Sequence, residues 1–510
     1  MTYRQNNLQL VAIIIALSGC FTAAKDELSL RPDGADEPTG GSTNAPDGRT
    51  GGSTDAANGS NTTGSGGDGG NDTESSSSDD SGGLTDTQNN DSCPDDDCSC
   101  TAKFGTNESA DCGQPGFAAG VEVSTAAFPP TAASQVAVTM GNDGNAAIFW
   151  TCRSPLATVA LCSRPFSHEQ GFGTLSTFAS DPVLGGVEIN EDAERGFVAG
   201  AVPGGDALVY FLQALSLPEV YSVPFSATTG WGQATRRDAD FWVDGSYALS
   251  ASDSGDGQMV VSWQTYDVGD GDGLHAHRYV EVVPSDGTQP TQLHDVSGPT
   301  TAASVGIDNS GRAILVDDDG IFYAYDGIAW SPQETSESAQ RPVVIGNGGH
   351  ALTGSQQLAA FDWDAGTWTS PEAVAANDNA HTDIDGQGNA LTVWSEGKLL
   401  EARRYSAEDD SWSELSVPAN AGQDITLLGL DVSPGGAGLA YWIDDDGMAW
   451  AQYYAPASGF GEATLLEGLS DGATAVYVEG ALDAEGLGLV AVVAEAADGK
   501  LSLQAYVLKR

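Results

Sequence analysis

The sequence is short of positive charge. Lysine and arginine together number 19, against 72 aspartates and glutamates, which gives a formal net charge of −53. The excess of acid is spread along the chain and is not confined to its first 115 residues. Such a surface repels phosphate backbones, so the composition excludes nucleic acid as a partner. It favours solubility and association with cations.

Long apolar runs and helical periodicity are also scarce. The apolar run from Leu8 to Leu17 is too short to cross a bilayer as a helix. No long stretch repeats its apolar residues at the helical period of about 3.6 positions, which argues against a helical fold. The folded part of the chain is therefore expected to consist of strands.

The N-terminal segment has the layout of an export signal. Arg4 precedes the apolar run, and Leu17-Ser18-Gly19-Cys20 closes it. Small residues are what a signal peptidase needs at its cleavage site. The segment resembles the lipobox of bacterial lipoproteins at all four positions. The resemblance implies that residues 1–19 are a signal peptide and that Cys20 carries the lipid that binds the protein to a membrane. Phe21 implies, by the same resemblance, sorting to the outer membrane of the cell envelope, where surface exposure stays open.

Residues 20–92 are dominated by Gly, Ser, Thr, Asp and Asn. Such a composition buries too little apolar surface to offset the entropy of ordering, so we expect a disordered linker. A flexible chain of about 70 residues has a mean reach of about 45 Å. The linker is thus expected to hold a folded body away from the lipid surface.

Six cysteines remain after Cys20 is assigned to lipid, and in an exported protein they are expected to form disulfides. Four of them lie in a Cys-rich junction at residues 93–115 and allow three pairings, between which the sequence does not choose. A zinc site there is the weaker alternative, because only one residue separates two of the cysteines. The other two flank a predicted hairpin, where a cross-strand disulfide is favoured. The junction cysteines are Cys93, Cys98, Cys100 and Cys112, and the hairpin cysteines are Cys152 and Cys162.

One pattern of short strands recurs past Gly116, about every 40–60 residues. Each copy has a Gly/Asp/Asn turn, an apolar strand that often ends in Trp, and a strand of alternating polarity. Four strands at this period are typical of a β-propeller blade. The sequence predicts an all-β propeller over 116–510 with eight blades, or seven because two copies are irregular. The turn-plus-strand copies begin near Asn142, Arg195, Gly257, Asp308, Gly349, Asp383, Gly435 and Ala484, those near Arg195 and Gly349 being irregular.

The two ends of the repeat region complement each other. The last copy stops after its third strand, at residues 501–507. Residues 116–123 match residues 459–466, which supply the outer strand of the preceding copy. An N-terminal strand that completes the last blade would remove the open edges of the ring. We therefore expect closure by this strand.

The repeat layout and the placement of Trp resemble the sialidase-like and fucose-lectin-like bacterial propellers. The resemblance covers 116–510 and implies a fold more firmly than a function. Sialidases carry an Asp-box, Ser-x-Asp-x-Gly-x-Thr-Trp, whose nearest match here is Ser252 to Gly257 without the Thr-Trp ending. The arginines are few and scattered, so a carboxylate-binding arginine cluster is not indicated. We expect no enzyme activity, with a glycoside hydrolase-like enzyme as a remote alternative.

Four tryptophans occupy the ends of equivalent strands. Every blade must bury both faces, so packing between blades is the favoured role. The alternative is stacking on a sugar in clefts between blades, as in propeller lectins. These residues are Trp150, Trp263, Trp394 and Trp442.

Metal ligands are not clearly indicated. His275 and His277 would share one face of a strand, but a solvated pair beside an acidic loop is favoured. Three acidic Gly-rich turns, 267–273, 317–320 and 444–447, could supply oxygen ligands. None has the alternating spacing and distal Glu of a known calcium loop, so solvated turns are favoured. No cofactor is expected, and calcium stays open.

These observations lead to one functional hypothesis. The sequence predicts a lipid-anchored, extracytoplasmic β-propeller that acts as a binding module for an envelope protein or a glycan. The loops and the central channel are the default binding surfaces. The first alternative is a carbohydrate-binding lectin, and the second is a glycoside hydrolase-like enzyme.

Overall fold

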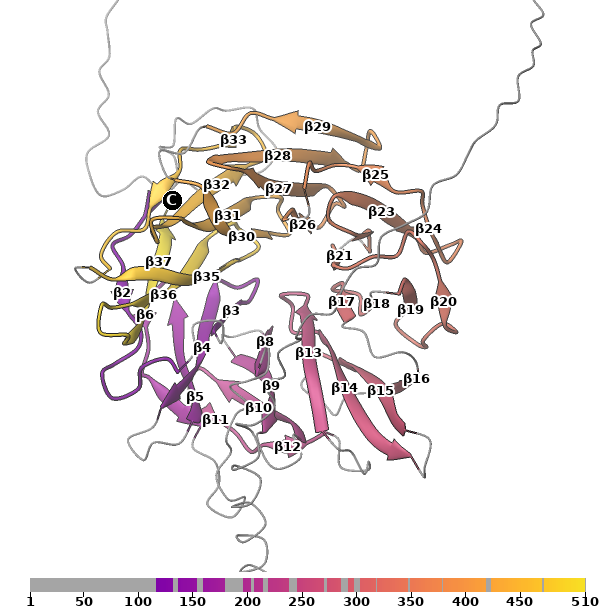
Figure 1. Cartoon of the computed structure of the whole chain (residues 1–510), viewed down its shortest axis with the longest axis horizontal. Helices are drawn as coiled ribbons and strands as arrows, with labels where there is room; N and C mark the ends of the chain where they lie inside the picture. The colour runs from indigo at the N-terminus through magenta and orange to yellow at the C-terminus, as the bar shows by residue number, and fades with distance from the viewer. Residues whose placement is uncertain are drawn as a thin grey trace, which may run out of the picture. The chain divides into compact units, whose positions relative to one another are not determined.

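The computed structural model describes residues 116–131, 136–153, 159–178, 196–202, 206–213, 219–237, 245–269, 273–285, 292–297, 303–317, 319–346, 349–377, 379–418, 423–469 and 472–509. The expected signal peptide, linker and Cys-rich junction lie outside these residues, and so do Cys20, Cys93, Cys98, Cys100 and Cys112. Every regular element in the described residues is a β-strand, and these residues contain no helix. They form eight sheets, each an antiparallel blade of a propeller, so the eight-bladed prediction is confirmed (Figure 1).

The first four blades follow the chain from the inside of the ring outward. Blade 1 contains β3 (Val136–Met140), β4 (Asn145–Arg153), β5 (Val159–Ser167), β6 (Gly171–Phe172) and β7 (Ser176–Phe178). Blade 2 contains β8 (Phe197–Val202), β9 (Asp206–Gln213), β10 (Glu219–Ser226), β11 (Gly230–Trp231) and β12 (Thr235–Arg236). Blade 3 contains β13 (Gly245–Asp253), β14 (Met259–Gly269), β15 (Gly273–Val283) and β16 (Gln292–Ser297). Blade 4 contains β17 (Ala303–Ile307), β18 (Ala313–Asp317), β19 (Ile321–Tyr325) and β20 (Glu334–Thr335).

The last four blades repeat this order. Blade 5 contains β21 (Val343–Ile345), β22 (Ala351–Thr353), β23 (Gln357–Asp362), β24 (Thr367–Trp368) and β25 (Glu372–Ala373). Blade 6 contains β26 (His381–Ile384), β27 (Ala390–Glu396), β28 (Leu399–Ser406) and β29 (Ser411–Leu415). Blade 7 contains β30 (Ile425–Val432), β31 (Gly438–Asp444), β32 (Ala449–Ala455), β33 (Gly459–Phe460) and β34 (Thr464–Leu465). Blade 8 contains β35 (Thr474–Leu482), β36 (Gly488–Glu495), β37 (Leu501–Lys509), β1 (Gly116–Phe117) and β2 (Val121–Glu122).

The innermost strands form a continuous circle. Each contacts the innermost strand of the next blade, from β3 through β8, β13, β17, β21, β26, β30 and β35 back to β3. Figure 1 shows these strands around the centre of the propeller. One copy of the repeat is placed differently from the prediction. The apolar stretch after Arg195 is the innermost strand β8 rather than a second strand, and β9 takes the second position in blade 2.

The last blade is assembled from both ends of the repeat region. Strands β1 and β2 pair antiparallel with β37, with Gly116 opposite Lys509 and Val121 opposite Ala505. The N–H of Val123 then donates to the Leu503 carbonyl at 2.8 Å. Strands β33 and β34 pair in the same way with β32 in blade 7, which is the equivalence expected from their sequences.

The core consists of layers between neighbouring blades. The second strand of a blade is buried on both faces, as β4 illustrates. Successive side chains of a strand point to opposite faces, so the residues of β4 pack alternately against the two neighbouring blades. Ile148 and Trp150 pack with Leu489 of blade 8, whereas Phe149 packs with Phe211 of blade 2. Burying a large apolar side chain contributes about 1.5–3 kcal/mol, so these layers hold the blades together.

A disulfide crosses the first blade. Cys152 and Cys162 lie on β4 and β5, with an S–S distance of 2.01 Å and a Cα–Cα distance of 5.8 Å. This is the pairing that the sequence favours. Both side chains are fully buried in the layer between blades 8 and 1.

An aspartate organises many of the tight turns. In the turn after β26, Asp385 Oδ1 accepts from the backbone N–H groups of Gln387 and Asn389, both at 2.8 Å. Asp308 and Asp483 accept at the same two positions in the turns after β17 and β35. A side-chain acceptor satisfies turn N–H groups that have no strand partner, which explains why the repeat needs Asp before its Gly.

The acidic turns 317–320 and 444–447 use the same device. Asp317 accepts from the N–H groups of Asp319 and Ile321, and Asp444 accepts from those of Asp446 and Met448. Asp317 and Asp444 are both 3% exposed, so the expectation of fully solvated turns is wrong for the first aspartate of each. In both turns the oxygen that accepts these backbone N–H groups is Oδ1.

Candidate functional site

The central channel is a cavity of about 340 Å³. Its lining comes from the innermost strands of seven blades: β3, β13, β17, β21, β26, β30 and β35. Strands that converge on one axis place side chains from distant parts of the sequence within one space. The channel is therefore the position where eight similar blades can build a site that no single blade contains.

Four carboxylates line this cavity: Asp253, Asp383, Asp431 and Glu479. Much of the remaining lining is apolar, with Ile384, Leu430 and Val432 among it. Each of the four acids is only partly accessible to solvent. This partial burial removes some of the water that would otherwise stabilise a charged carboxylate.

Two of these acids link successive blades. Asp383 on β26 accepts from the backbone N–H of Val432 on β30 at 2.7 Å. Asp431 on β30 accepts from the N–H of Leu482 on β35 at 2.6 Å. The innermost strand is the edge of its sheet, so half of its N–H groups have no strand partner. The aspartates occupy equivalent positions, two residues before the turn, and supply the missing acceptors.

Asp253 makes the same kind of link in the opposite direction. It lies on β13 and accepts from the N–H of Ala201 on β8, in the preceding blade, at 3.3 Å. Its other oxygen accepts from the N–H of Gly255 at 2.9 Å. Asp253 comes one residue before its turn rather than two, and a shift of one residue in a strand reverses the direction of the side chain.

Tyr441 packs beside the carboxylates between two glycines. A Cβ atom at Gly480 would lie 2.8 Å from the Tyr441 ring, and one at Gly429 would overlap it. The innermost strands β30 and β35 therefore need glycine where this ring approaches them. Glu479 accepts from the Tyr477 hydroxyl at 2.6 Å.

Burial shifts the ionisation of the channel aspartates. Burial raises the pKa of Asp253 to about 6, although its backbone N–H bonds oppose the shift. Burial also raises the pKa of Asp383 to about 7, and the nearby carboxylate of Asp385 acts in the same direction. The pKa of Asp431 lies well above its usual range, first because of burial and then because of Asp383. Burial therefore raises the pKa of all three aspartates above that of a solvated carboxyl group.

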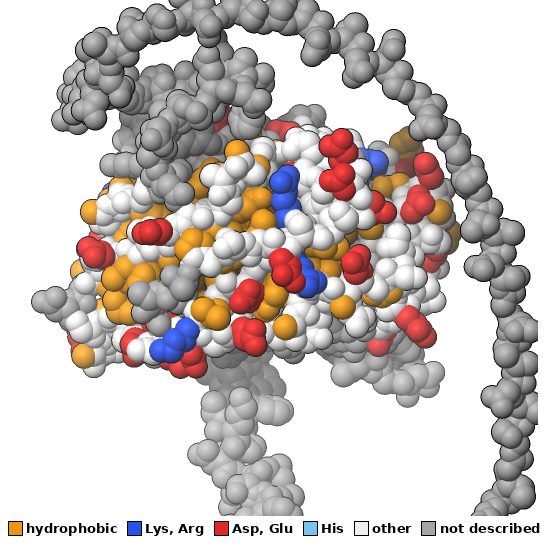
Figure 2. Space-filling model, turned by 90° about the horizontal axis from the view of Figure 1, so that it is seen from above, with side chains coloured by type: hydrophobic (Ala, Val, Ile, Leu, Met, Phe, Trp, Pro, Cys, Tyr) orange, Lys and Arg blue, Asp and Glu red, His pale blue; other side chains and the backbone are white. Residues whose placement is uncertain are grey.

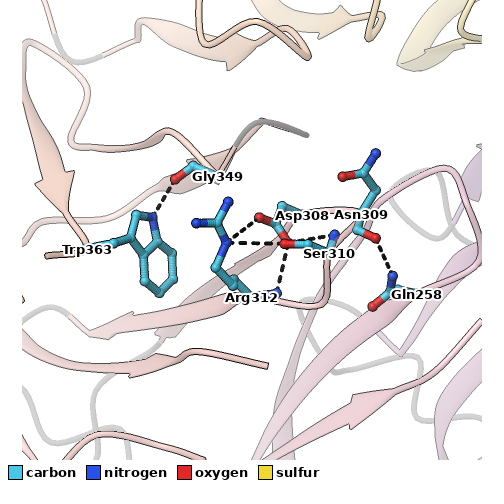
Figure 3. Close-up of polar contacts among 7 residues, drawn as sticks. All are labelled: Gln258, Asp308, Asn309, Ser310, Arg312, Gly349 and Trp363. Carbon is cyan, nitrogen blue, oxygen red and sulfur yellow. Dashed lines mark hydrogen bonds and ion pairs between the residues drawn. The ribbon is translucent and has the colours of Figure 1, made fainter. Parts of the chain in front are cut away.

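The turns that follow the innermost strands are joined from blade to blade. Gln258 Nε2 in blade 3 donates to the Asn309 carbonyl in blade 4 at 2.5 Å (Figure 3). The Arg312 guanidinium of blade 4 lies 5.2 Å from the centre of the Trp363 ring of blade 5. The Trp363 indole N–H donates to the Gly349 carbonyl. A cation over an aromatic face contributes about 0.5–1 kcal/mol at exposed sites.

These turns share a packing rule. The side chain after the turn glycine of one blade packs against the turn glycine of the next. Gln258 illustrates it, because a Cβ atom at Gly311 would lie 2.7 Å from Gln258 Oε1. All of these glycines have positive φ, where glycine is the residue that fits without strain. The rule also pairs Arg312 with Gly349 and His350 with Gly388.

Blades 1 and 3 are linked directly by the turns that follow their innermost strands. The Asn142 N–H of blade 1 donates to the Gly255 carbonyl of blade 3 at 3.1 Å. The Asn142 side chain donates to Asp256 Oδ1 at 2.6 Å. Asn142 and Gly255 both belong to the channel lining.

The four strand-end tryptophans are core residues in the structure. Trp150 and Trp442 are 0% exposed, Trp263 is 1% exposed and Trp394 is 8% exposed. No ring face among them is free to stack on a sugar, so their burial supports packing between blades. The Trp442 ring stacks on the ring of Trp450, which lies on the third strand of blade 7, with 6.5 Å between the ring centroids.

The remaining candidates are not brought together. The incomplete Asp-box at 252–257 forms the end of β13 and its turn, where Asp253 has the linking role described above. His277 stacks on Tyr279 at 6.4 Å between centroids, and the side chain of His275 lies outside the described residues. Among the described residues, no group of three His, Cys, Asp or Glu side chains is arranged to hold a metal ion. In the same residues no helix is long and apolar enough to span a membrane.

The sequence analysis did not single out the channel carboxylates. Asp383 and Asp431 are two of 72 acidic residues, and nothing in composition separates them from the rest. Their position carries a signal: each lies two places before a turn and directly before an apolar residue, Ile384 or Val432. The outer surface does not single out a comparable group of acids. Acidic side chains are scattered over the face drawn in Figure 2, with fewer basic side chains among them.

Comparisons with known proteins assign no family to the chain. No protein-family model matches the chain, and no curated protein matches it significantly. Among solved structures, the C-terminal WD40 domain of Sif2 aligns with a TM-score of 0.43 at 10% sequence identity. The alignment covers 76% of this chain and 98% of that domain. The blade count rests on the sheets of the structure itself.

Proposed function

We propose that this protein is a lipid-anchored, extracytoplasmic binding module of the bacterial cell envelope. The observation that carries the proposal is the closed eight-bladed ring, with loop-built faces and a central channel of about 340 Å³. Rigid rings that present loops and a central cavity are suited to binding, because the scaffold fixes loop positions in advance. The lipobox-like residues before Cys20 support the anchor, and the acidic, glycine-rich linker supports a tethered body.

Anchoring is tested by substitution at the lipidation position. We expect Cys20→Ser to release the protein from the membrane fraction and to remove incorporation of a labelled fatty acid. Ser18→Ala is the matched control, because it keeps a small residue in the lipobox and should leave both properties unchanged. The proposed anchor would be refuted if the wild-type chain incorporated no labelled fatty acid, or if the Cys20→Ser chain still sedimented with membranes.

Binding is tested with the full-length protein in neutral detergent. A glycan array, with and without calcium, reports on sugars, and photo-crosslinking in intact cells reports on an envelope protein. The proposal expects saturable binding in one of the two assays, absent from a heat-denatured sample. Absence from both would contradict a binding role at the envelope.

The carbohydrate-binding alternative now needs other aromatic side chains. The partly exposed ring of Trp412 packs on Tyr405 at 5.3 Å between centroids, at the outer edge of blade 6. A lectin that uses such edges would lose binding in Trp412→Ala while unfolding at the wild-type midpoint. The glycoside hydrolase-like alternative predicts turnover of chromogenic glycosides that a single carboxylate substitution abolishes.

A further inference from the structure

The channel carboxylates belong to different blades and face a single cavity. Asp253 comes from blade 3, Asp383 from blade 6 and Asp431 from blade 7. Each accepts a backbone N–H from the innermost strand of an adjacent blade. We propose that Asp253, Asp383 and Asp431 form one proton-binding cluster, whose occupancy sets the stability of the ring. This inference does not depend on the identity of any bound partner.

The groups around Asp431 explain why the cluster acts as a unit. Asp383 on β26 and Asp253 on β13 both interact electrostatically with Asp431, and so does Glu479 on β35. The Tyr441 hydroxyl also belongs to this set, and burial keeps its pKa well above the usual value. Interacting acids release their protons in steps that belong to the group rather than to one residue.

The groups around Asp383 and Asp253 complete the list. Asp385 faces Asp383 from the following turn and disfavours its ionisation. His381 lies on the same strand, and burial lowers its pKa, so it tends to remain neutral and gives little compensating charge. Asp253 is approached by the turn that carries Asp256, whose carboxylate accepts from Asn142. Among the described residues, the groups that shift the pKa of these three aspartates are carboxylates and backbone N–H groups.

The sign of the pH dependence follows from these shifts. An aspartate in an unfolded chain has a pKa near 3.9, below the values of about 6 for Asp253 and about 7 for Asp383. Between the unfolded and folded values the folded chain holds more protons, so its free energy of unfolding falls as pH rises. Below about pH 4 both states are protonated and the dependence ends. The ring is thus expected to be more stable at mildly acidic pH than at alkaline pH.

The first test compares unfolding across this window. Denaturant unfolding of the full-length chain is measured at about pH 5 and about pH 8, for wild type, Asp383→Asn and Asp431→Asn. The matched control is Asp364→Asn, which removes one exposed carboxylate. In the wild-type chain the unfolding constant should be larger at about pH 8 than at about pH 5. We expect the ratio of the pH 8 constant to the pH 5 constant to be at least tenfold smaller in each channel variant than in wild type, since one pKa unit is a factor of ten. The control should keep the wild-type ratio.

The control separates the cluster from general repulsion on an acidic surface. A channel variant with the same ratio as wild type and Asp364→Asn would overturn the proposal. A second measurement uses only the wild-type chain, so it does not depend on whether a variant folds. Carbon NMR follows the titration of the aspartate carboxyl groups. At least one carboxyl should titrate above about pH 6. Titration of every aspartate below about pH 5 would overturn the proposal as well.

Discussion

The contact between His350 and Gly388 offers a direct measure of how strongly neighbouring turns hold the blades together. Gly388 lies in the turn after β26 with φ +87°, and the His350 side chain of blade 5 packs against it. An alanine at position 388 would place its Cβ atom 2.3 Å from His350 Cδ2, so the two side chains would overlap. Gly366 serves as a control, because it has φ +67° and no atom would lie within 4 Å of its Cβ.

The expected losses follow from two separate effects. A left-handed backbone costs a non-glycine residue about 1–2 kcal/mol, partly offset by about 0.4–1 kcal/mol from a less flexible unfolded chain. Gly366→Ala should therefore lower the free energy of unfolding by about 1 kcal/mol. Gly388→Ala should lose a further 1–3 kcal/mol, roughly, from the overlap with His350.

Denaturant unfolding of both variants measures this difference. Repeating Gly388→Ala in a His350→Ala background should remove the additional loss, because the overlapping ring is gone, and the two substitutions should then be strongly non-additive. Equal losses for Gly366→Ala and Gly388→Ala, or full additivity with His350→Ala, would refute the turn-to-turn packing described above.

Three further outcomes are expected. Replacing Cys152 and Cys162 by serine removes a link across 10 positions and should lower the free energy of unfolding by about 2–3 kcal/mol; an unfolding midpoint insensitive to reductant would contradict this. Asp385→Ala leaves two turn N–H groups without their acceptor and should cost about 2 kcal/mol, with Asp385→Asn less damaging, as thermal unfolding can show. Trp394→Ala should cost about 3 kcal/mol because the ring is buried, so a variant with wild-type stability would show that the side chain is not a core residue.

The blade architecture was predictable because each blade repeats local chemistry. The Asp before the turn, the glycine with positive φ and the apolar second strand recur at similar spacing, and each has a local physical cause. The prediction failed in detail at blade 2, where the stretch after Arg195 forms the innermost strand β8. Strand β8 ends at Val202 and the second strand, β9, begins at Asp206, so an apolar stretch alone did not distinguish two buried strands of one blade.

The candidate site was not predictable for a different reason. The place of an aspartate two residues before a turn is a local signal, but whether its side chain reaches a neighbouring blade depends on the blade-to-blade arrangement. Asp383 and Asp253 link opposite neighbours because of a one-residue difference in position along the strand. The tryptophans were expected at strand ends, but Trp150 and Trp442 lie inside β4 and β31. Only the packing of two blades determines that both side chains are fully covered.

The pairing of β1 and β2 with β37 has a consequence for biosynthesis. Gly116 lies opposite Lys509, so the sheet of blade 8 needs residues that are made almost 400 positions apart. A ribosome delivers these residues at opposite ends of translation, and long-range strand pairing is slow to form. Seven blades can therefore gather as an open arc with exposed strand edges while the eighth waits for its final strand. A nascent chain of this kind remains vulnerable to aggregation until β37 has been made, and a truncation that removes β37 would leave blade 8 without the strand that pairs with β1, β2 and β36.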